Sequence, residues 1–132
     1  ADVLDQMEPD DAADLIAHEV RRVTGYDRVW VYKFHEDWHG EVIAESRAPG
    51  VEESWLGLHY PASDIPAQAR MLFLANPLRM IADVDAASCP LLADPAAADV
   101  PLDLSHAVLR GVSPVHLQYL RNMKVRASLS LS

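Results

Sequence analysis

Apolar residues recur every three or four positions over the first part of the chain, between Pro9 and Val23. This spacing places them on one face of a helix. Asp10 and Asp11 open the segment and Gly25 follows its basic end, which suits the helix dipole and the preference for glycine after a helix. The pattern therefore predicts an amphipathic helix over Pro9 to Val23. The residues of its apolar face are Ala13, Ile16, Ala17, Val20 and Val23.

Two runs of strand-forming residues follow this helix. The first, Arg28 to His35, is β-branched and aromatic and is apolar on both faces, and the second extends from Glu41 to Arg47. The polar turn Glu36 to Gly40 joins them, so an antiparallel hairpin is predicted. Further strands are predicted over Leu78 to Val84 and Lys124 to Ser132. The last alternates strictly between apolar and polar residues, so one face should pack and the other should meet water or a polar ligand.

Prolines define where the later helices begin. Pro61 and Pro66 hold φ near −65° and push the preceding residues toward extended backbone, so a helix can begin only after Pro66. It is predicted over Ala67 to Asn76, with Ser63 or Asp64 available as its cap.

A second proline signal predicts the last helix. Ser113 as cap and Pro114 at the first position should start a helix over Val115 to Met123. Ahead of it, the residues from Asp85 to Leu104 are predicted as a long connection rich in Ala, Asp and Pro. A connection of this length is usually functional or mobile.

Composition narrows the class of protein. The 132 residues, half of them hydrophobic, suit one compact domain. A net charge of −9 argues against a nucleic-acid surface, and no apolar run is long enough for a membrane span. The single cysteine, Cys89, excludes an internal disulfide and suits a reducing cytoplasm. Because the chain starts at Ala1 and stops at Ser132 within a strand-like alternation, we expect it to be a piece of a longer protein.

The sequence favours a binding domain over an enzyme. Its six histidines form no His-x-x-x-His pair on a predicted helix, because His35 and His39, which have this spacing, lie in the predicted hairpin. Its five glycines form neither a P-loop nor a dinucleotide-binding turn. Arg79 and Arg110 could each grip a carboxylate if they face a pocket, or lie at a solvated edge. His116 and Tyr119 are spaced to face the same way on a helix, and a purely structural histidine is the alternative. The segment around Asp64 could equally be a plain capping loop.

Several motifs occur in a characteristic order. The chain closely resembles the chromophore-binding GAF domain of bacterial phytochromes from about Gly25 to Ser132. The segments that carry the resemblance are Asp27-Arg28-Val29 leading to Tyr32, Gly40-Glu41-Val42-Ile43-Ala44-Glu45, Asp64-Ile65-Pro66, and Ser113 to Met123 followed by the strand with Ser128 and Ser130.

The resemblance implies an α+β fold, with a GAF-type antiparallel sheet flanked by helices and the last strands of the fold lying beyond Ser132. It implies a single GAF domain over residues 1–132, from a cytoplasmic PAS-GAF-PHY photoreceptor that can form a homodimer. The family binds a linear tetrapyrrole, biliverdin in bacterial members, and a photon isomerises it. Any kinase or other output activity would belong to other domains. The rival expectations are a GAF domain for a cyclic nucleotide or haem, and a chromophore-free dimerisation module that pairs through the helix from Pro9 to Val23.

The resemblance also assigns roles to site residues. The backbone carbonyl of Asp64 and the His116 side chain would meet the pyrrole nitrogens. Ile65 and Pro66 would pack against the macrocycle, and Trp30 would add aromatic wall. The D ring would lie near Tyr32, Tyr60 and Tyr119. The two propionates would be held by Arg79, Arg110, Ser113, Ser128 and Ser130.

The chain departs from the family pattern at three positions. Val115 stands where plant and many cyanobacterial members carry the attachment cysteine, and Cys89 lies in a loop, so non-covalent binding is expected. Phe73 stands where relatives often have tyrosine, and Lys124 where many have glycine. The last two differences bear on spectral tuning.

Overall fold

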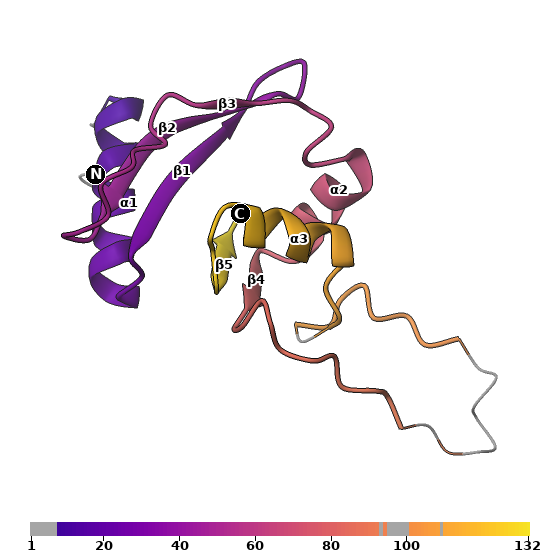
Figure 1. Ribbon diagram of the computed structural model, residues 1–132. Coiled ribbons are helices and arrows are strands. Elements are labelled where there is room, and N and C mark those ends of the chain that lie inside the picture. Colours follow the sequence, from indigo (N-terminus) through magenta and orange to yellow (C-terminus); the bar gives the residue numbers. More distant parts are fainter. Residues whose placement is uncertain (1–7, 93, 95–100, 109) are drawn as a thin grey trace. The chain divides into compact units, whose positions relative to one another are not determined.

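The computed structural model describes residues 8–92, 94, 101–108 and 110–132, and the chain divides into two compact units (Figure 1). The first unit extends to Pro66 and holds α1 (Pro9–Thr24), β1 (Arg28–Phe34), β2 (Gly40–Arg47) and β3 (His59–Tyr60). The second begins at Ala67 and holds α2 (Ala67–Ala75), β4 (Leu78–Ile81), α3 (Pro114–Asn122) and β5 (Ser128–Leu131).

The helix α1 confirms the helix predicted from the N-terminal pattern. Pro9 stands at its first position, and Gly25 ends it with φ +74°, donating its N–H to the Arg21 carbonyl at 2.9 Å. Ala13 and Ala17 are buried against Ala44 of the sheet. The predicted apolar face is buried only in part, however, since Ile16 is 47% exposed and Val23 is 75% exposed.

The first unit contains a three-stranded antiparallel sheet in the order β1-β2-β3. The predicted hairpin is confirmed, with Arg28 paired to Arg47 at one end and Phe34 to Gly40 at the other. The register shifts between Val31 and Tyr32, which pair with Ala44 and Val42, so β2 carries one extra residue, Ile43. Gly40 also pairs with Tyr60 of β3, so it lies in the central strand.

The second unit pairs β4 with β5 in antiparallel register, Arg79 opposite Ser130 and Ile81 opposite Ser128. Its buried apolar side chains are Val84 and Leu120. Ser113 occupies the N-cap position of α3 with Pro114 next to it, but the serine hydroxyl forms no capping hydrogen bond, contrary to the sequence prediction.

Two further predictions need correction. The last strand is shorter than predicted because Lys124 has φ +58°, a left-handed conformation that breaks an extended run, and the ladder begins only at Ser128. The described strands also form two sheets where one was predicted, because apolar periodicity shows where strands lie but not which edges pair. Among the described residues, no helix is long and apolar enough to cross a membrane.

Candidate functional site

Five aromatic side chains of the first unit form a continuous cluster, here called the aromatic row. Its members are Trp30, Tyr32, Phe34, Trp55 and Tyr60, and all are partly buried. Trp30 and Trp55 have ring centroids 4.9 Å apart, and Tyr32 lies 5.2 Å from Phe34. Tyr60 lies 6.0 Å from both Trp30 and Tyr32. The row therefore joins two of the predicted tyrosines and the predicted Trp30 wall.

Phe34 and Trp55 are the members of the aromatic row that were not predicted as site residues. Trp55 lies in the segment between β2 and β3, outside any periodic pattern, and the available signal was its aromatic character shortly before the strand β3. The guanidinium carbon of Arg28 lies 3.5 Å from the centroid of the Trp55 ring, a cation–π contact that holds the indole against the sheet.

The phenol groups of the row share an electrostatic environment with Asp64. Burial raises the pKa of Tyr32 and of Tyr60, and the negative charge of Asp64 raises both further, although Arg28 opposes the shift at Tyr60. Both hydroxyls therefore stay protonated and can donate hydrogen bonds at neutral pH. Asp64 is exposed and follows a turn in which its N–H donates to the Pro61 carbonyl at 3.0 Å. Next to it, Ile65 is half-buried and Pro66 is exposed.

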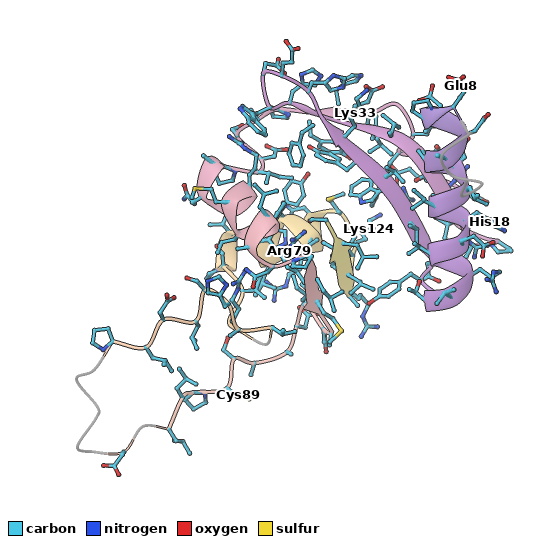
Figure 2. All side chains as sticks on the ribbon, turned by 180° about the vertical axis from the view of Figure 1, so that it is seen from behind. Glu8, His18, Lys33, Arg79, Cys89 and Lys124 are labelled. Carbon is cyan, nitrogen blue, oxygen red and sulfur yellow. The ribbon has the colours of Figure 1, made fainter. Side chains whose placement is uncertain are left out.

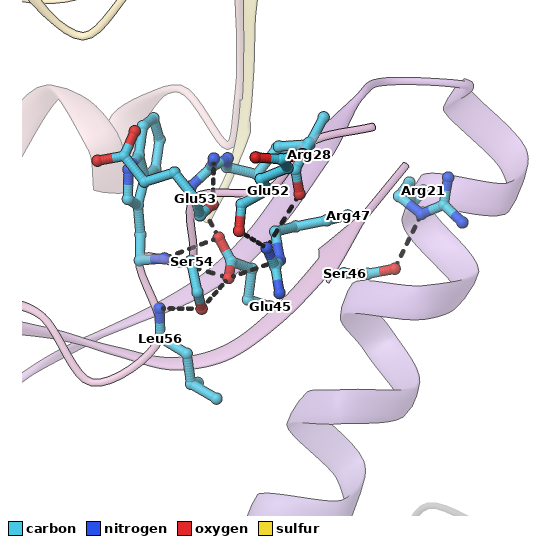
Figure 3. Close-up of polar contacts among 11 residues, drawn as sticks. Arg21, Arg28, Glu45, Ser46, Arg47, Glu52, Glu53, Ser54 and Leu56 are labelled. Carbon is cyan, nitrogen blue, oxygen red and sulfur yellow. Dashed lines mark hydrogen bonds and ion pairs between the residues drawn. The ribbon is translucent and has the colours of Figure 1, made fainter. Parts of the chain in front are cut away.

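A buried carboxylate fixes the loop that carries Trp55 (Figure 3). The Glu45 side chain is 2% exposed and accepts from Arg28 Nη1 at 2.9 Å and from the Ser54 hydroxyl at 2.7 Å. It also accepts the Trp55 backbone N–H at 3.2 Å and pairs with Arg47 Nε at 3.3 Å. Glu45 thus links β1, β2 and the following loop, a role the sequence analysis did not predict.

In the second unit, Arg79 and Arg110 lie close enough to repel each other. Burial lowers the pKa of Arg79, and the positive charge of Arg110 lowers it further. Arg79 Nη1 donates to the Asn76 carbonyl at 2.8 Å and its Nη2 to the Ser132 hydroxyl at 3.1 Å, while Arg110 Nη1 donates to the Ser105 carbonyl at 2.7 Å. Within the described part of the chain, neither guanidinium forms an ion pair with a carboxylate.

The hydroxyl groups predicted for the site fall into two places. Ser130 lies directly opposite Arg79, and Ser128 two residues away on the same face of the β4–β5 pair, so these serines and the arginine share one face (Figure 2 labels Arg79). Ser113 lies at the start of α3 and is exposed. The register therefore places two of the three serines beside a guanidinium.

His116 and Tyr119 lie on the first two turns of α3. His116 is exposed as a whole residue, but partial desolvation of its ring lowers the pKa. The imidazole is therefore neutral at pH 7. Tyr119 is 36% exposed. It lines a shallow, open depression of α3 with Pro114, Val115, Gln118 and Asn122, which lacks the walls needed to enclose a ligand.

Two other candidate centres can be assessed. Cys89 is exposed in the connection after β4. In the described ranges, no three His, Cys, Asp or Glu side chains are arranged to hold a metal ion. The predicted site residues therefore gather in two groups: Tyr32, Tyr60, Asp64, Ile65 and Pro66 in the first unit, and Arg79, Arg110, Ser113, His116, Tyr119, Ser128 and Ser130 in the second.

The lowered pKa of His116 predicts how stability depends on pH. The unfolded chain takes up a proton at this histidine near pH 6.5, before the folded chain does. The contribution of His116 to the stability of the folded chain is therefore fully present above that pH, and it is lost as the pH falls through the lower pKa that His116 has in the folded chain. Urea unfolding of the chain and of His116→Gln between about pH 8 and about pH 5 checks this, and we expect a shallower decline for the variant. Equal declines would contradict the assignment, because the other histidines contribute equally to both proteins.

The comparisons with known proteins assign the family. The GAF domain family matches residues 8–132, and the chain therefore belongs to the GAF domain family. Within it, the chain is similar to bacteriophytochromes. That of Pseudomonas aeruginosa is 54% identical over 128 residues, which cover 92% of this chain and 17% of that protein. That of Xanthomonas campestris pv. campestris is 52% identical over 125 residues, which cover 92% of this chain and 19% of that protein.

A solved structure supports the same assignment. The chromophore-binding domain of Stigmatella aurantiaca phytochrome P1 matches with a TM-score of 0.91 at 46% identity, over 98% of this chain and 42% of that chain. The predicted resemblance and the GAF-type α+β fold class are confirmed. The chain spans less than a fifth of the length of the two bacteriophytochromes.

Proposed function

We propose that this chain is a light-sensing domain that binds biliverdin non-covalently and passes the signal to neighbouring domains. The observation that carries the proposal is the pair Arg79 and Arg110, two guanidiniums that repel each other and form no ion pair with a carboxylate among the described residues. A ligand with two carboxylates would relieve this repulsion and replace the backbone carbonyls that now accept from both arginines. Biliverdin carries two propionates.

The serines complete this anionic end of the proposed site. Ser128 and Ser130 share a sheet face with Arg79 and can donate hydrogen bonds to a propionate oxygen. Ser113 can do the same at the start of α3, where its hydroxyl is not used in capping. The arginines would provide positive charge and the serines would provide directional hydrogen bonds, both to the propionates of the ligand.

The rest of the tetrapyrrole calls for flat apolar walls and uncharged hydrogen-bonding groups. The aromatic row offers the walls, and the protonated phenols of Tyr32 and Tyr60 can donate to a ring carbonyl. The Asp64 carbonyl can accept from pyrrole N–H groups, and neutral His116 can donate or accept. When bound, the tetrapyrrole supplies a red-absorbing conjugated system whose methine double bond isomerises on absorbing a photon.

The protein residues would hold the tetrapyrrole rings in one arrangement before the photon is absorbed and in another arrangement afterwards. Tyr32, Tyr60 and Asp64 are electrostatically coupled, so a rearrangement of hydrogen bonds at one of them alters the others. Val115 and the exposed loop position of Cys89 favour non-covalent binding. We propose that PAS and PHY domains flank the chain in a cytoplasmic parent protein, that the parent can dimerise, and that any enzymatic output resides outside this domain.

An absorption titration of the purified chain with biliverdin tests the proposal. We expect a strong red band that decreases under red light and is lost from the protein on denaturation. Pigment that stays attached after denaturation would point to covalent attachment at Cys89. If no red band forms and the chain binds haem or a cyclic nucleotide instead, the small-ligand rival is favoured. If no red band forms and the ligand-free chain is a dimer, the dimerisation module is favoured.

Asp64→His tests the proposed photochemical role of the acidic residue. Since the backbone carbonyl stays in place, the variant should still bind biliverdin, while the loss of the carboxylate should suppress photoconversion at least about tenfold. The amplitude of the light-minus-dark spectrum measures this, and Asp14→His on the exposed face of α1 serves as the control. Normal photoconversion in Asp64→His would remove the carboxylate from the mechanism.

A further inference from the structure

We propose that Gly40 is a positioning residue for Tyr32, and that the absence of its side chain sets where the Tyr32 ring and hydroxyl lie. The inference deepens the proposed function, because Tyr32 belongs to the proposed chromophore site. It concerns a glycine that touches no ligand and acts only through the tyrosine.

The contact between the two residues is direct. Gly40 is buried in β2, and a Cβ placed on it would overlap three atoms of one side chain, Cε1, Cζ and the hydroxyl oxygen of Tyr32, all well inside 3.0 Å. No turn or left-handed backbone accounts for this glycine, since the residue lies in a paired strand and its φ is not positive. Close approach of a ring is therefore the reason that only glycine fits.

The neighbouring rings prevent Tyr32 from moving aside. Gly40 pairs across the sheet with Phe34 on one side and with Tyr60 on the other. The Phe34 ring meets the Tyr32 ring edge-on, with centroids 5.2 Å apart and planes at 80°, and the Tyr60 ring lies 6.0 Å away. An aromatic side chain laid over a glycine in the adjacent strand covers the exposed backbone and fills the volume of the missing side chain.

This placement determines what the hydroxyl meets. Because Ile43 is an extra residue in β2, Tyr32 pairs with Val42, which shares a strand face with Gly40. The space over Gly40 receives the hydroxyl end of the Tyr32 ring. In that position the phenol is within the field of Asp64 and beside Tyr60, and both raise its pKa. A side chain at position 40 would push the hydroxyl out of this arrangement.

The test is a double-mutant cycle on the full chain with Gly40→Ala, Tyr32→Ala and the double variant, with Gly111→Ala as control because a Cβ there meets nothing within 4 Å. Without ligand, we expect Gly40→Ala to lower the Tm by about 5 °C or more and to change the near-ultraviolet circular dichroism of the tyrosines. With biliverdin, we expect an about tenfold higher Kd and a shifted red band.

In the Tyr32→Ala background, adding Gly40→Ala should cause little further change in Tm, Kd or band position, because the overlapping ring is gone. Equal effects of Gly40→Ala in both backgrounds, or an effect no larger than that of Gly111→Ala, would overturn the proposal. If no variant binds biliverdin, the proposed function fails, and the ligand-free Tm and dichroism cycle still decides whether Gly40 positions Tyr32.

Discussion

Replacing Glu45 by alanine should lower the free energy of unfolding by about 3–5 kcal/mol, the range for removing one partner of a buried ion pair. The Arg28 side chain, 14% exposed, loses its carboxylate, and the Ser54 hydroxyl and the Trp55 N–H lose their acceptor. Unsatisfied groups in a buried place are costlier than the interaction itself. Urea unfolding followed by circular dichroism measures the change.

The matched control for Glu45→Ala is Glu19→Ala. Glu19 also pairs with an arginine, Arg22 at 2.6 Å, but both side chains are well exposed. Solvent and salt screen such a pair, so the control should leave the unfolding midpoint nearly unchanged. A Glu45→Ala variant as stable as Glu19→Ala would show that the loop from β2 to Trp55 does not depend on this carboxylate.

Replacing Arg79 by alanine should raise the Kd for the proposed ligand biliverdin about 10- to 100-fold, the loss expected for a charge-assisted hydrogen bond to a propionate. Arg79 is half-buried, faces the same side of the sheet as Ser130, and is electrostatically linked to Arg110. Absorption titration at a temperature where the variant is folded measures the affinity. Arg79→Lys should have an intermediate effect, because lysine retains the charge without the planar fork.

Arg126→Ala is the control for Arg79→Ala. It removes the same charge from the same unit at an exposed position. If the two variants bind biliverdin equally well, general electrostatic attraction accounts for the role of Arg79 and the specific propionate contact is excluded. If only Arg79→Ala weakens binding, the assignment of the anionic end stands.

Local chemistry made the main elements predictable. The helical spacing before Gly25 and the Ser113-Pro114 signal both predicted helices to within about two residues of those observed. The hairpin followed from two strand-like runs around a polar turn. Such signals lie within a few neighbouring residues, so the sequence alone carries them.

Features that depend on distant partners were not predictable in this way. Nothing near Glu45 in sequence indicates that Arg28 and Trp55 converge on it, because the contacts span 17 and 10 residues. The pairing of Arg79 with Ser130 likewise joins strands that are far apart in the chain. The family resemblance supplied the proposed site residues, whereas only the folded arrangement shows that Arg79 forms no ion pair with a carboxylate in the described part of the chain.

The aromatic row also gives the chain a built-in optical reporter. The chain has three tryptophans. The ring centroids of Trp30 and Trp55, both in the aromatic row, lie 4.9 Å apart, whereas Trp38 lies in the hairpin turn and is 51% exposed. The tryptophan fluorescence should therefore have a blue-shifted component from the partly buried Trp30 and Trp55 and a red-shifted component from the exposed Trp38. Fluorescence lifetimes of the blue-shifted component would report ligand binding and conformational change at the aromatic row in real time, without any added label.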